Sequence, residues 1–343
     1  MIYAPVIIPT LCRAEKLKNC IGSLQRNPYA KYTELYISLD YPSAEKYREG
    51  YLEIKSYLEQ GIVGFANVVI LEQKENQGWY QNFQILKHKV FEKYDCYIGS
   101  EDDNEFSPNF LEYMDRCLTE YEHDENILAV SGYSYPIDWQ IGDCNVLKVQ
   151  SYFAGWGYGI WRDKENKMMQ MLTMEQFEKR LRSLKCMRKL YRASHNQYCN
   201  FIKGMIGYTD MLVENGQVMG VDLAFGLYQI FEDKYMVFPA VSKARNTGYG
   251  EDGVHCKELE SVSKDGINHR NYPYHEQPID SQQRFEEIKM APDTDRDKQI
   301  ILMEKFFTVS LRERIGSFLA QMWCALFGRD MLVKRIEGIK TNR

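Results

Sequence analysis

The residues with the clearest capacity for chemistry form the acidic run Glu101-Asp102-Asp103. It follows the apolar residues 97–99, which predict the end of a strand, and it precedes residues 106–110, which predict the start of a helix. Adjacent carboxylates at a strand end suit a hard divalent cation such as Mg²⁺ or Mn²⁺, which takes oxygen ligands and leaves positions for phosphate oxygens. A solvated acidic turn that caps the helix is the alternative, and the strand-end context favours the metal site.

A second candidate is the lone carboxylate of Asp222, which lies in the otherwise apolar stretch 219–224. Burying a carboxylate is costly unless it is paired or functional. As a general base it would take a proton from an attacking hydroxyl group. A purely structural interpretation, compatible with the first, is that Asp222 is the N-cap of a helix that begins near Leu223. If Asp222 is not the base, Glu251 and Asp252 are the next candidates.

Two further segments combine glycine with side chains that bind ligands. Residues 155–161 hold three glycines among aromatic residues, so the backbone can approach a ligand closely and Trp156, beside Gly157, offers a flat face for stacking. This segment predicts either part of a ligand pocket or a tightly packed strand. His255 follows a glycine-rich loop, where it is either a ligand for a metal or diphosphate or an ordinary surface histidine.

The elements that must position these residues alternate along the N-terminal part of the chain. Hydrophobic patterns predict strands at 5–9, 35–39, 66–71 and 94–99, separated by helices at 14–26, 44–60 and 79–93. Such alternation predicts an α/β fold with a mostly parallel sheet and helices on both faces. Ligands bind at the carboxyl ends of strands in such sheets. Asp40 and the acidic run therefore fall on one rim.

The later part of the chain predicts strands near 127–133, 146–153 and 237–240, a basic helix at 174–193 and a last helix from about 298 to 338. Residues 179–203 hold eight Lys or Arg and no acid. A basic amphipathic helix either lies on anionic lipid, or holds a lipid-linked diphosphate, or packs on its own domain or a second subunit. Both helices keep these alternatives open, including homo-oligomerisation through the last one.

Composition narrows the class of protein. The net charge of −5 and pI of about 5.8 give no sign of nucleic-acid binding. Nine scattered cysteines without a C-x-x-C pair favour reduced thiols over a disulfide framework or zinc site. Neither a signal peptide nor an apolar run of 18 residues is visible. We therefore expect a cytoplasmic protein, with peripheral contact with the inner face of the membrane if a basic helix binds lipid.

The acidic run also carries a family resemblance. Residues 101–114, which continue as Phe-Ser-Pro-Asn-Phe-Leu-Glu-Tyr-Met, resemble the DXD-type motif of N-acetylglucosaminyltransferase I and related bacterial glycosyltransferases of the GT-A fold. Further segments resemble that family in the same order along residues 3–256. They are 8–13 (Ile-Pro-Thr-x-x-Arg), 37–40 (Ile-Ser-Leu-Asp), 76–78 (Asn-Gln-Gly), 131–136, 155–161 and 243–256.

The resemblance implies a role for each matched residue. Asp103, joined by His255, would hold Mn²⁺ or Mg²⁺, while Asp222 would be the catalytic base of an inverting reaction. The donor would be a nucleotide-diphosphate sugar, most simply a UDP-sugar such as UDP-GlcNAc, and the acceptor a glycan or lipid-linked sugar of a bacterial surface polysaccharide. The implied donor-binding residues are Pro9, Thr10, Arg13, Asp40, Gln77, Gly78, Glu101, Asp102, Trp156, Gly157 and His255.

The resemblance also implies a GT-A catalytic domain over residues 1–280, followed by a C-terminal helical segment over 281–343. The activity expected is that of a hexosyl- or N-acetylhexosaminyltransferase. Two rivals stay open. A nucleotidyltransferase of related fold would need a glycine-rich first loop, which residues 10–16 lack. A carbohydrate-binding protein without catalysis would not depend on the carboxylates.

Overall fold

Strands and helices alternate through the N-terminal part of the chain, as the sequence predicts. The computed structural model describes residues 1–171, 173–207, 213–214, 217–218, 221–248, 269, 272–293 and 296–334. Its first elements are β1 (Val6–Thr10), α1 (Ala14–Gln25), β2 (Glu34–Leu39), α2 (Arg48–Glu59), β3 (Asn67–Glu72), α3 (Gly78–Phe91) and β4 (Cys96–Gly99). These are followed by β5 (Asn104–Phe106), α4 (Phe110–Glu120), β6 (Ile127–Ser131), β7 (Val146–Val149) and β8 (Tyr158–Trp161).

The central sheet has eight strands in the order β3-β2-β1-β4-β8-β6-β11-β7, where β11 is Tyr235–Pro239. The strands β1 to β4 pair in parallel, and β11 runs parallel to β6. Strand β8 is antiparallel to both of its neighbours, and β7 is antiparallel to β11. The expectation of an α/β fold with a mostly parallel sheet is confirmed.

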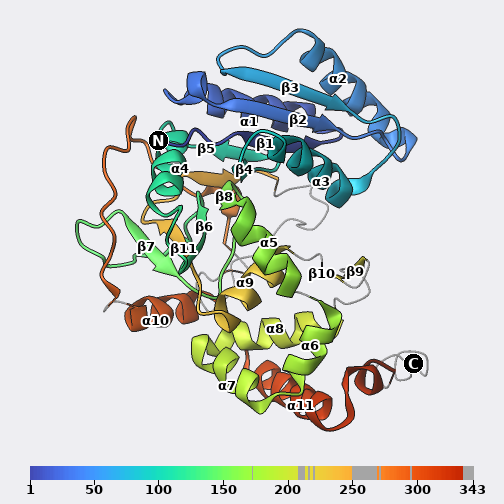
Figure 1. Cartoon of the computed structure of the whole chain (residues 1–343), viewed down its shortest axis with the longest axis vertical. Helices are drawn as coiled ribbons and strands as arrows, with labels where there is room; N and C mark the ends of the chain where they lie inside the picture. The colour runs from blue at the N-terminus through green and yellow to red at the C-terminus, as the bar shows by residue number, and fades with distance from the viewer. Residues whose placement is uncertain are drawn as a thin grey trace.

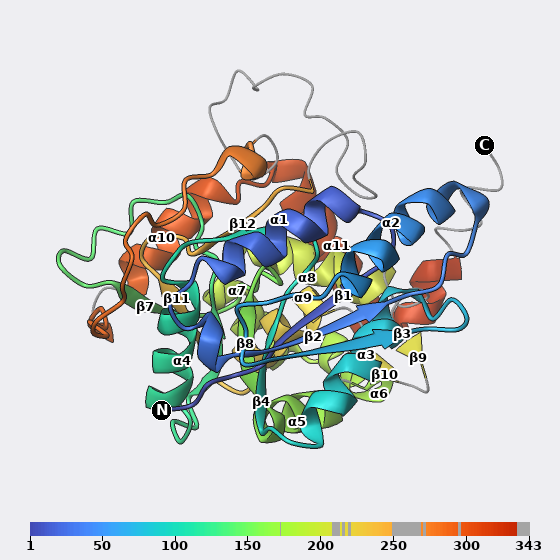
Figure 2. The same ribbon diagram turned by 90° about the horizontal axis from the view of Figure 1, so that it is seen from above.

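Helices cover both faces of this sheet because the strand residues alternate between the two faces. In β1, Val6 and Ile8 belong to one buried cluster with Ile54 of α2, whereas Ile7 belongs to the other with Leu86 of α3. Figure 2 shows α1 and α2 on one side of β1 to β3 and α3 on the other. This period of two is what a strand buried on both faces requires.

The C-terminal half contributes most of the remaining helices. These are α5 (Arg162–Met171), α6 (Met174–Leu181), α7 (Leu184–Ala193), α8 (His195–Gly207), α9 (Val221–Phe231), α10 (Arg296–Phe306) and α11 (Leu311–Phe327). Two short pairs of strands complete the described fold: β9 (Val213–Glu214) with β10 (Gln217–Val218), and β12 (Ala244–Asn246) with β5. Helices α6, α7, α8 and α11 gather at the end of the molecule opposite α2 and β3 (Figure 1).

Each of the two long helices that the sequence predicts is in fact interrupted. The helix expected at 174–193 breaks between α6 and α7, where the side chain of Ser183 accepts a hydrogen bond from the backbone N–H of Cys186. The helix expected at 298–338 breaks before Ser310, which forms a reciprocal capping box with Glu313. Within the described part of the chain, no helix is long and apolar enough to cross a membrane.

Candidate functional site

The acidic run lies in the turn between β4 and β5, where a guanidinium group holds two of its carboxylates. Arg13, from the loop after β1, donates to Asp102 and, at 2.6 Å, to Oδ2 of Asp103. The hydroxyl of Thr10 donates to Oδ2 of Asp102 at 2.8 Å. Because β1 and β4 are parallel neighbours, their carboxyl ends bring Thr10, Arg13 and the run together at one rim.

The other side of the acidic run is held by β12. The side-chain amide of Asn246 donates to Oδ1 of Asp103 at 2.9 Å and to Oε2 of Glu101 at 3.2 Å. Its own oxygen accepts from the backbone N–H of Gly248 at 2.8 Å. The N–H of Thr247 donates to the carbonyl of Asp103 at 2.8 Å. Asn246 thus spans two carboxylates and fixes their separation.

The site carries more negative charge than the described side chains offset. Burial, followed by the charges of Asp103, Asp222 and Asp102, raises the pKa of Glu101 to about 8. Burial also raises the pKa of Asp102, against the opposing effect of Arg13. Burial of Arg13 disfavours its charged form and so lowers its pKa. The charges of Asp102 and Asp103 have the larger combined effect, and the pKa of Arg13 is raised. An added cation is favoured in such surroundings.

The residues fit a hard divalent cation in donor chemistry. Their donors are carboxylate oxygens, which Mg²⁺ and Mn²⁺ prefer, and Asp103 is buried at the strand-end rim. Among the described residues no group of three or more His, Cys, Asp or Glu is arranged as a metal site. An ion bound together with a diphosphate needs only one or two protein carboxylates, because phosphate oxygens and water complete its shell. The assignment of the ion to Asp103 stays a prediction.

Asp40 lies at the same rim and organises the loop before α3. Its two carboxylate oxygens accept from the N–H groups of Gln77 and Gly78 at 2.8 and 2.9 Å, from its neighbour Tyr41 at 2.9 Å and from the amide of Asn76 at 3.2 Å. Four donors fill the acceptor positions of one carboxylate. The observed role of Asp40 is thus to fix the N-terminus of α3, and its contact with a nucleotide stays a prediction.

Asp222 is brought to the acidic run although 119 residues separate it from Asp103. It is the second residue of α9, not the N-cap that the sequence allowed. The residue is exposed to solvent, while the surrounding protein desolvates its carboxyl group and raises the pKa of Asp222 to about 6. Its charge contributes to the raised pKa of Glu101, so the two carboxyl groups interact.

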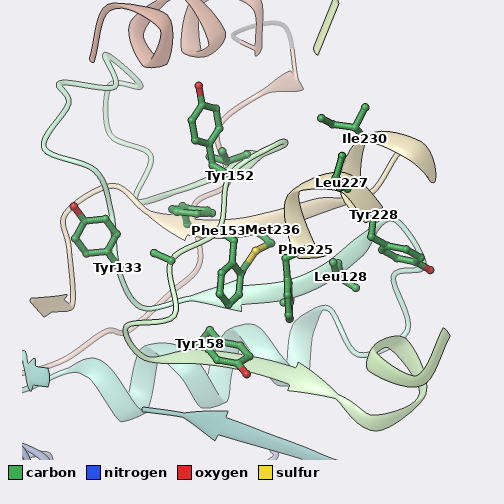
Figure 3. Packing of buried hydrophobic residues seen from close by; sticks show 14 of the residues in the cluster. Leu128, Tyr133, Tyr152, Phe153, Tyr158, Phe225, Leu227, Tyr228, Ile230 and Met236 are labelled. Atoms are coloured by element: carbon green, nitrogen blue, oxygen red, sulfur yellow. The ribbon is translucent and has the colours of Figure 1, made fainter. Parts of the chain in front are cut away.

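Aromatic packing fixes the helix that carries Asp222. Phe225, one turn further along α9, packs on Phe153 with ring centroids 4.1 Å apart and on Tyr158 of β8 at 5.6 Å (Figure 3). Tyr158 in turn lies edge-on to Tyr97 of β4, with centroids 6.0 Å apart. A chain of rings therefore ties α9 to the strand that ends at the acidic run.

The segment around Trp156 packs against β5, where Gly157 approaches Phe106. Trp156 is half-buried and meets the rings of Tyr133 and Tyr274 edge-on, with centroids 4.7 and 5.5 Å away. Gly157 has a φ of +73°, and a Cβ atom there would come within 2.7 Å of Phe106. Both positions therefore have a structural role, and a sugar contact for them stays a prediction. Pro9 is buried within β1 beside the rim.

His255 lies outside the described residues, as do the alternative bases Glu251 and Asp252. The position of that predicted metal ligand relative to Asp103 stays a prediction.

A buried ion pair anchors the start of β12. Lys243, whose side chain is almost fully buried, donates to the carboxylate of Asp280. Asp280 also accepts from the amide of Asn109 at 3.0 Å. A short distance on, Arg284 makes a two-point contact with the buried Glu112 of α4 at 2.8 and 2.9 Å. The segment after residue 272 thus clamps β12 to α4, upstream of the Asn246 contact.

Three residues at the site were not assigned roles from the sequence. These are Asn246, Lys16, which donates to the carbonyl of Thr247 at 2.5 Å, and Gly248, where a Cβ atom would lie 1.9 Å from Oδ2 of Asp103. For Asn246 and Gly248, the only indication in the sequence was that they lie in the segment 243–256, whose glycines allow close approach of the backbone. The three-residue pairing of β12 with β5 is too short to be read from periodicity.

Comparison with known proteins gives fold neighbours only. No protein-family model and no curated protein matches the chain. Among solved structures, the mannosyltransferase PcManGT from Pyrobaculum calidifontis, in complex with GDP-Man and Mn²⁺, is similar over 48% of this chain and 46% of its own, with 12% identity and a TM-score of 0.34.

A second neighbour is TarS of S. aureus. Its residues 1–349 are similar over 49% of this chain and 50% of theirs, with 12% identity and a TM-score of 0.34. A longer TarS structure gives 9% identity, 30% coverage of its own chain and a TM-score of 0.32. The likeness spans half or less of each neighbour, so the function is inferred below from the site's own side chains.

Proposed function

We propose that the chain is a metal-dependent, inverting glycosyltransferase that moves a hexosyl or N-acetylhexosaminyl group from a nucleotide-diphosphate sugar to a glycan or lipid-linked acceptor. The observation that supports this most is the convergence of Glu101, Asp102 and Asp103 with Arg13 and, from a distant helix, Asp222. A carboxylate-rich rim with one guanidinium suits a diphosphate bound through a cation.

The proposed roles follow from position. Asp103 would hold Mn²⁺ or Mg²⁺, which supplies Lewis-acid stabilisation of the charge that develops on the departing diphosphate. Arg13 lies beside Asp103 and would add a fixed positive charge next to the departing diphosphate. Glu101 and Asp102 would bind the ribose or the donor sugar, with UDP-GlcNAc or another UDP-sugar as the donor.

The acceptor side needs a separate base, because the acidic run is engaged with Arg13 and Asn246. Asp222 fits this role, since the residue reaches the surface and desolvation raises the pKa of its carboxyl group to about 6. A base of that pKa is ionised at neutral pH and still has useful proton affinity. It would take the proton of the acceptor hydroxyl as that oxygen attacks the anomeric carbon and the bond to the diphosphate breaks.

We further propose that residues 1–280 are the catalytic domain, with Asp40, Gln77, Gly78, Trp156 and Gly157 lining the donor region and His255 closing on the metal. Residues 281–343 would form the helical segment that contacts a membrane or a second copy. The product would belong to surface-glycan assembly.

Titration calorimetry with a panel of nucleotide sugars, with and without Mn²⁺, tests the proposal. We expect a nucleotide-diphosphate sugar to bind more tightly in the presence of Mn²⁺ and to release its nucleoside diphosphate when an acceptor is added. Preferential binding of a nucleoside triphosphate would contradict the assignment and favour nucleotidyl transfer.

A further inference from the structure

Helix α11 buries polar residues and exposes apolar ones, the reverse of an ordinary surface helix. The side that packs on α8 carries Ser317, Gln321 and Cys324, and Gln321 accepts from the hydroxyl of Tyr198 at 2.5 Å. A helix that docks on a globular protein usually buries an apolar stripe and exposes polar residues.

The outward side of α11 is apolar instead. Six of its large apolar side chains are each at least 52% exposed. One is Phe327, and the other five are Leu311, Ile315, Phe318, Leu319 and Leu326. Their spacing of three, four and seven residues places them on one face, opposite the residues that contact α8. A continuous exposed apolar face of this kind marks an interaction site. We call these five residues the α11 stripe.

Basic residues lie at the same end of the molecule as the α11 stripe. Arg182, which follows α6, lies beside Gly328, which follows α11, and α7 begins two residues after Arg182. The exposed face of α7 carries Lys185, Arg188 and Arg192. Residues 179–203 contain no acid at all, and Figure 1 shows α7 and α11 at the same end of the molecule.

We propose that the α11 stripe and the basic face of α7 together dock the protein on an anionic lipid bilayer. Apolar side chains enter the boundary between headgroups and acyl chains while Lys and Arg pair with lipid phosphates. A second copy of the chain fits less well, because a symmetric dimer through this end would bring two basic α7 faces together. Docking does not depend on the proposed transfer reaction, so lipid binding tests it alone.

The experiment uses the full chain and vesicles of phosphatidylcholine with phosphatidylglycerol, beside vesicles of phosphatidylcholine alone. We expect binding to the anionic vesicles that weakens as salt is added. The double variant Ile315→Glu/Leu319→Glu should bind at least tenfold more weakly, since it loses apolar burial and adds repulsion. The matched control Leu52→Glu/Val63→Glu alters two exposed apolar residues at the opposite end and should bind like the unaltered protein.

A second variant separates charge from apolar contact. Arg188→Gln/Arg192→Gln should bind anionic vesicles about 30-fold more weakly, since each basic residue near such a surface contributes about 1 kcal/mol. All four altered positions on α7 and α11 are exposed, so thermal unfolding should match the control. Absence of binding by the unaltered protein, or equal binding by the stripe variant and its control, would overturn the proposal. So would a dimer in sedimentation velocity that the stripe variant dissociates without any vesicle binding.

Discussion

The bridge that Asn246 makes between two carboxylates can be tested by the single change Asn246→Asp. The substitution keeps the size of the side chain, and the remaining oxygen can still accept from Gly248. It removes both donated hydrogen bonds, at 2.9 Å to Asp103 and 3.2 Å to Glu101, and places another carboxyl group between these two.

The size of the effect follows from these contacts. A hydrogen bond to a charged group contributes about 1.5–3 kcal/mol and one to a neutral group about 0.5–1.5 kcal/mol. Because a pKa of about 8 leaves Glu101 mostly protonated at pH 7, losing the bonds to Asp103 and Glu101 together costs about 2–4.5 kcal/mol. The variant limits this cost by binding a proton. Protonating a carboxyl group of ordinary pKa at pH 7 costs about 4 kcal/mol, or about 1.4 kcal/mol per pH unit. We therefore expect the free energy of unfolding to fall by about 2–4 kcal/mol at pH 7.

The sign of the pH dependence is fixed by linkage. The introduced carboxyl group keeps its proton to higher pH in the folded protein than in the unfolded chain, so the folded state binds more protons between about pH 4 and pH 7. The stability deficit should therefore shrink as the pH is lowered through this range. Added Mn²⁺ should also shrink it, because a cation offsets the same charge.

Urea unfolding of chelator-treated protein at a series of pH values measures both quantities. Asn200→Asp is the matched control, because Asn200 is exposed and bonds only to Gln197 of its own helix among the contacts described. The control should change stability by no more than about 0.5 kcal/mol. A deficit for Asn246→Asp below about 1 kcal/mol, or one that does not change with pH, would refute the bridging role.

Two further predictions concern the base and the packing on the metal-binding carboxylate. Asp222→Asn should leave donor affinity intact and lower turnover by about 10²-fold or more. For the unaltered enzyme, kcat/KM should decrease as the pH is lowered through about 6, where Asp222 gains its proton. Near-normal turnover of the variant would place the base elsewhere. Gly248→Ala should weaken Mn²⁺ binding, because the new Cβ atom would lie 1.9 Å from Oδ2 of Asp103. In the control Gly316→Ala the new Cβ atom meets nothing within 4 Å, so Mn²⁺ affinity should not change. Equal Mn²⁺ affinities of the two variants would show that the contact has no bearing on the metal.

The strands that build the rim could be predicted because each is decided locally. β1, β2 and β4 are short apolar runs followed by polar residues, and the parallel arrangement follows from the helices between them. That was enough to place Asp40 and the acidic run together. The breaks at Ser183 and Ser310 were missed because the hydrophobic spacing continues through them, although the capping pattern Ser310-x-x-Glu313 was readable.

The contacts that complete the site could not be predicted because they depend on pairings far apart in sequence. β12 reaches β5 across 140 residues between Glu105 and Arg245, with only three residues in each strand. No local pattern distinguishes such strands from loop. Likewise, the interaction of Asp222 with Glu101 depends on ring packing between Phe225 and Tyr158, which only the folded chain brings together.

The most direct test of the proposed function is calorimetric titration of UDP into the protein, with and without Mn²⁺, for the unaltered chain and Asp103→Asn. We predict that Mn²⁺ tightens UDP binding to the unaltered protein and has no such effect on Asp103→Asn. The variant should still fold, because Asp103 lies in a turn at a strand end, although it loses the ion pair with Arg13. The control Asp143→Asn, at an exposed loop residue, should keep the full effect of Mn²⁺. Mn²⁺-dependent affinity that persists in Asp103→Asn would contradict a metal site at Asp103.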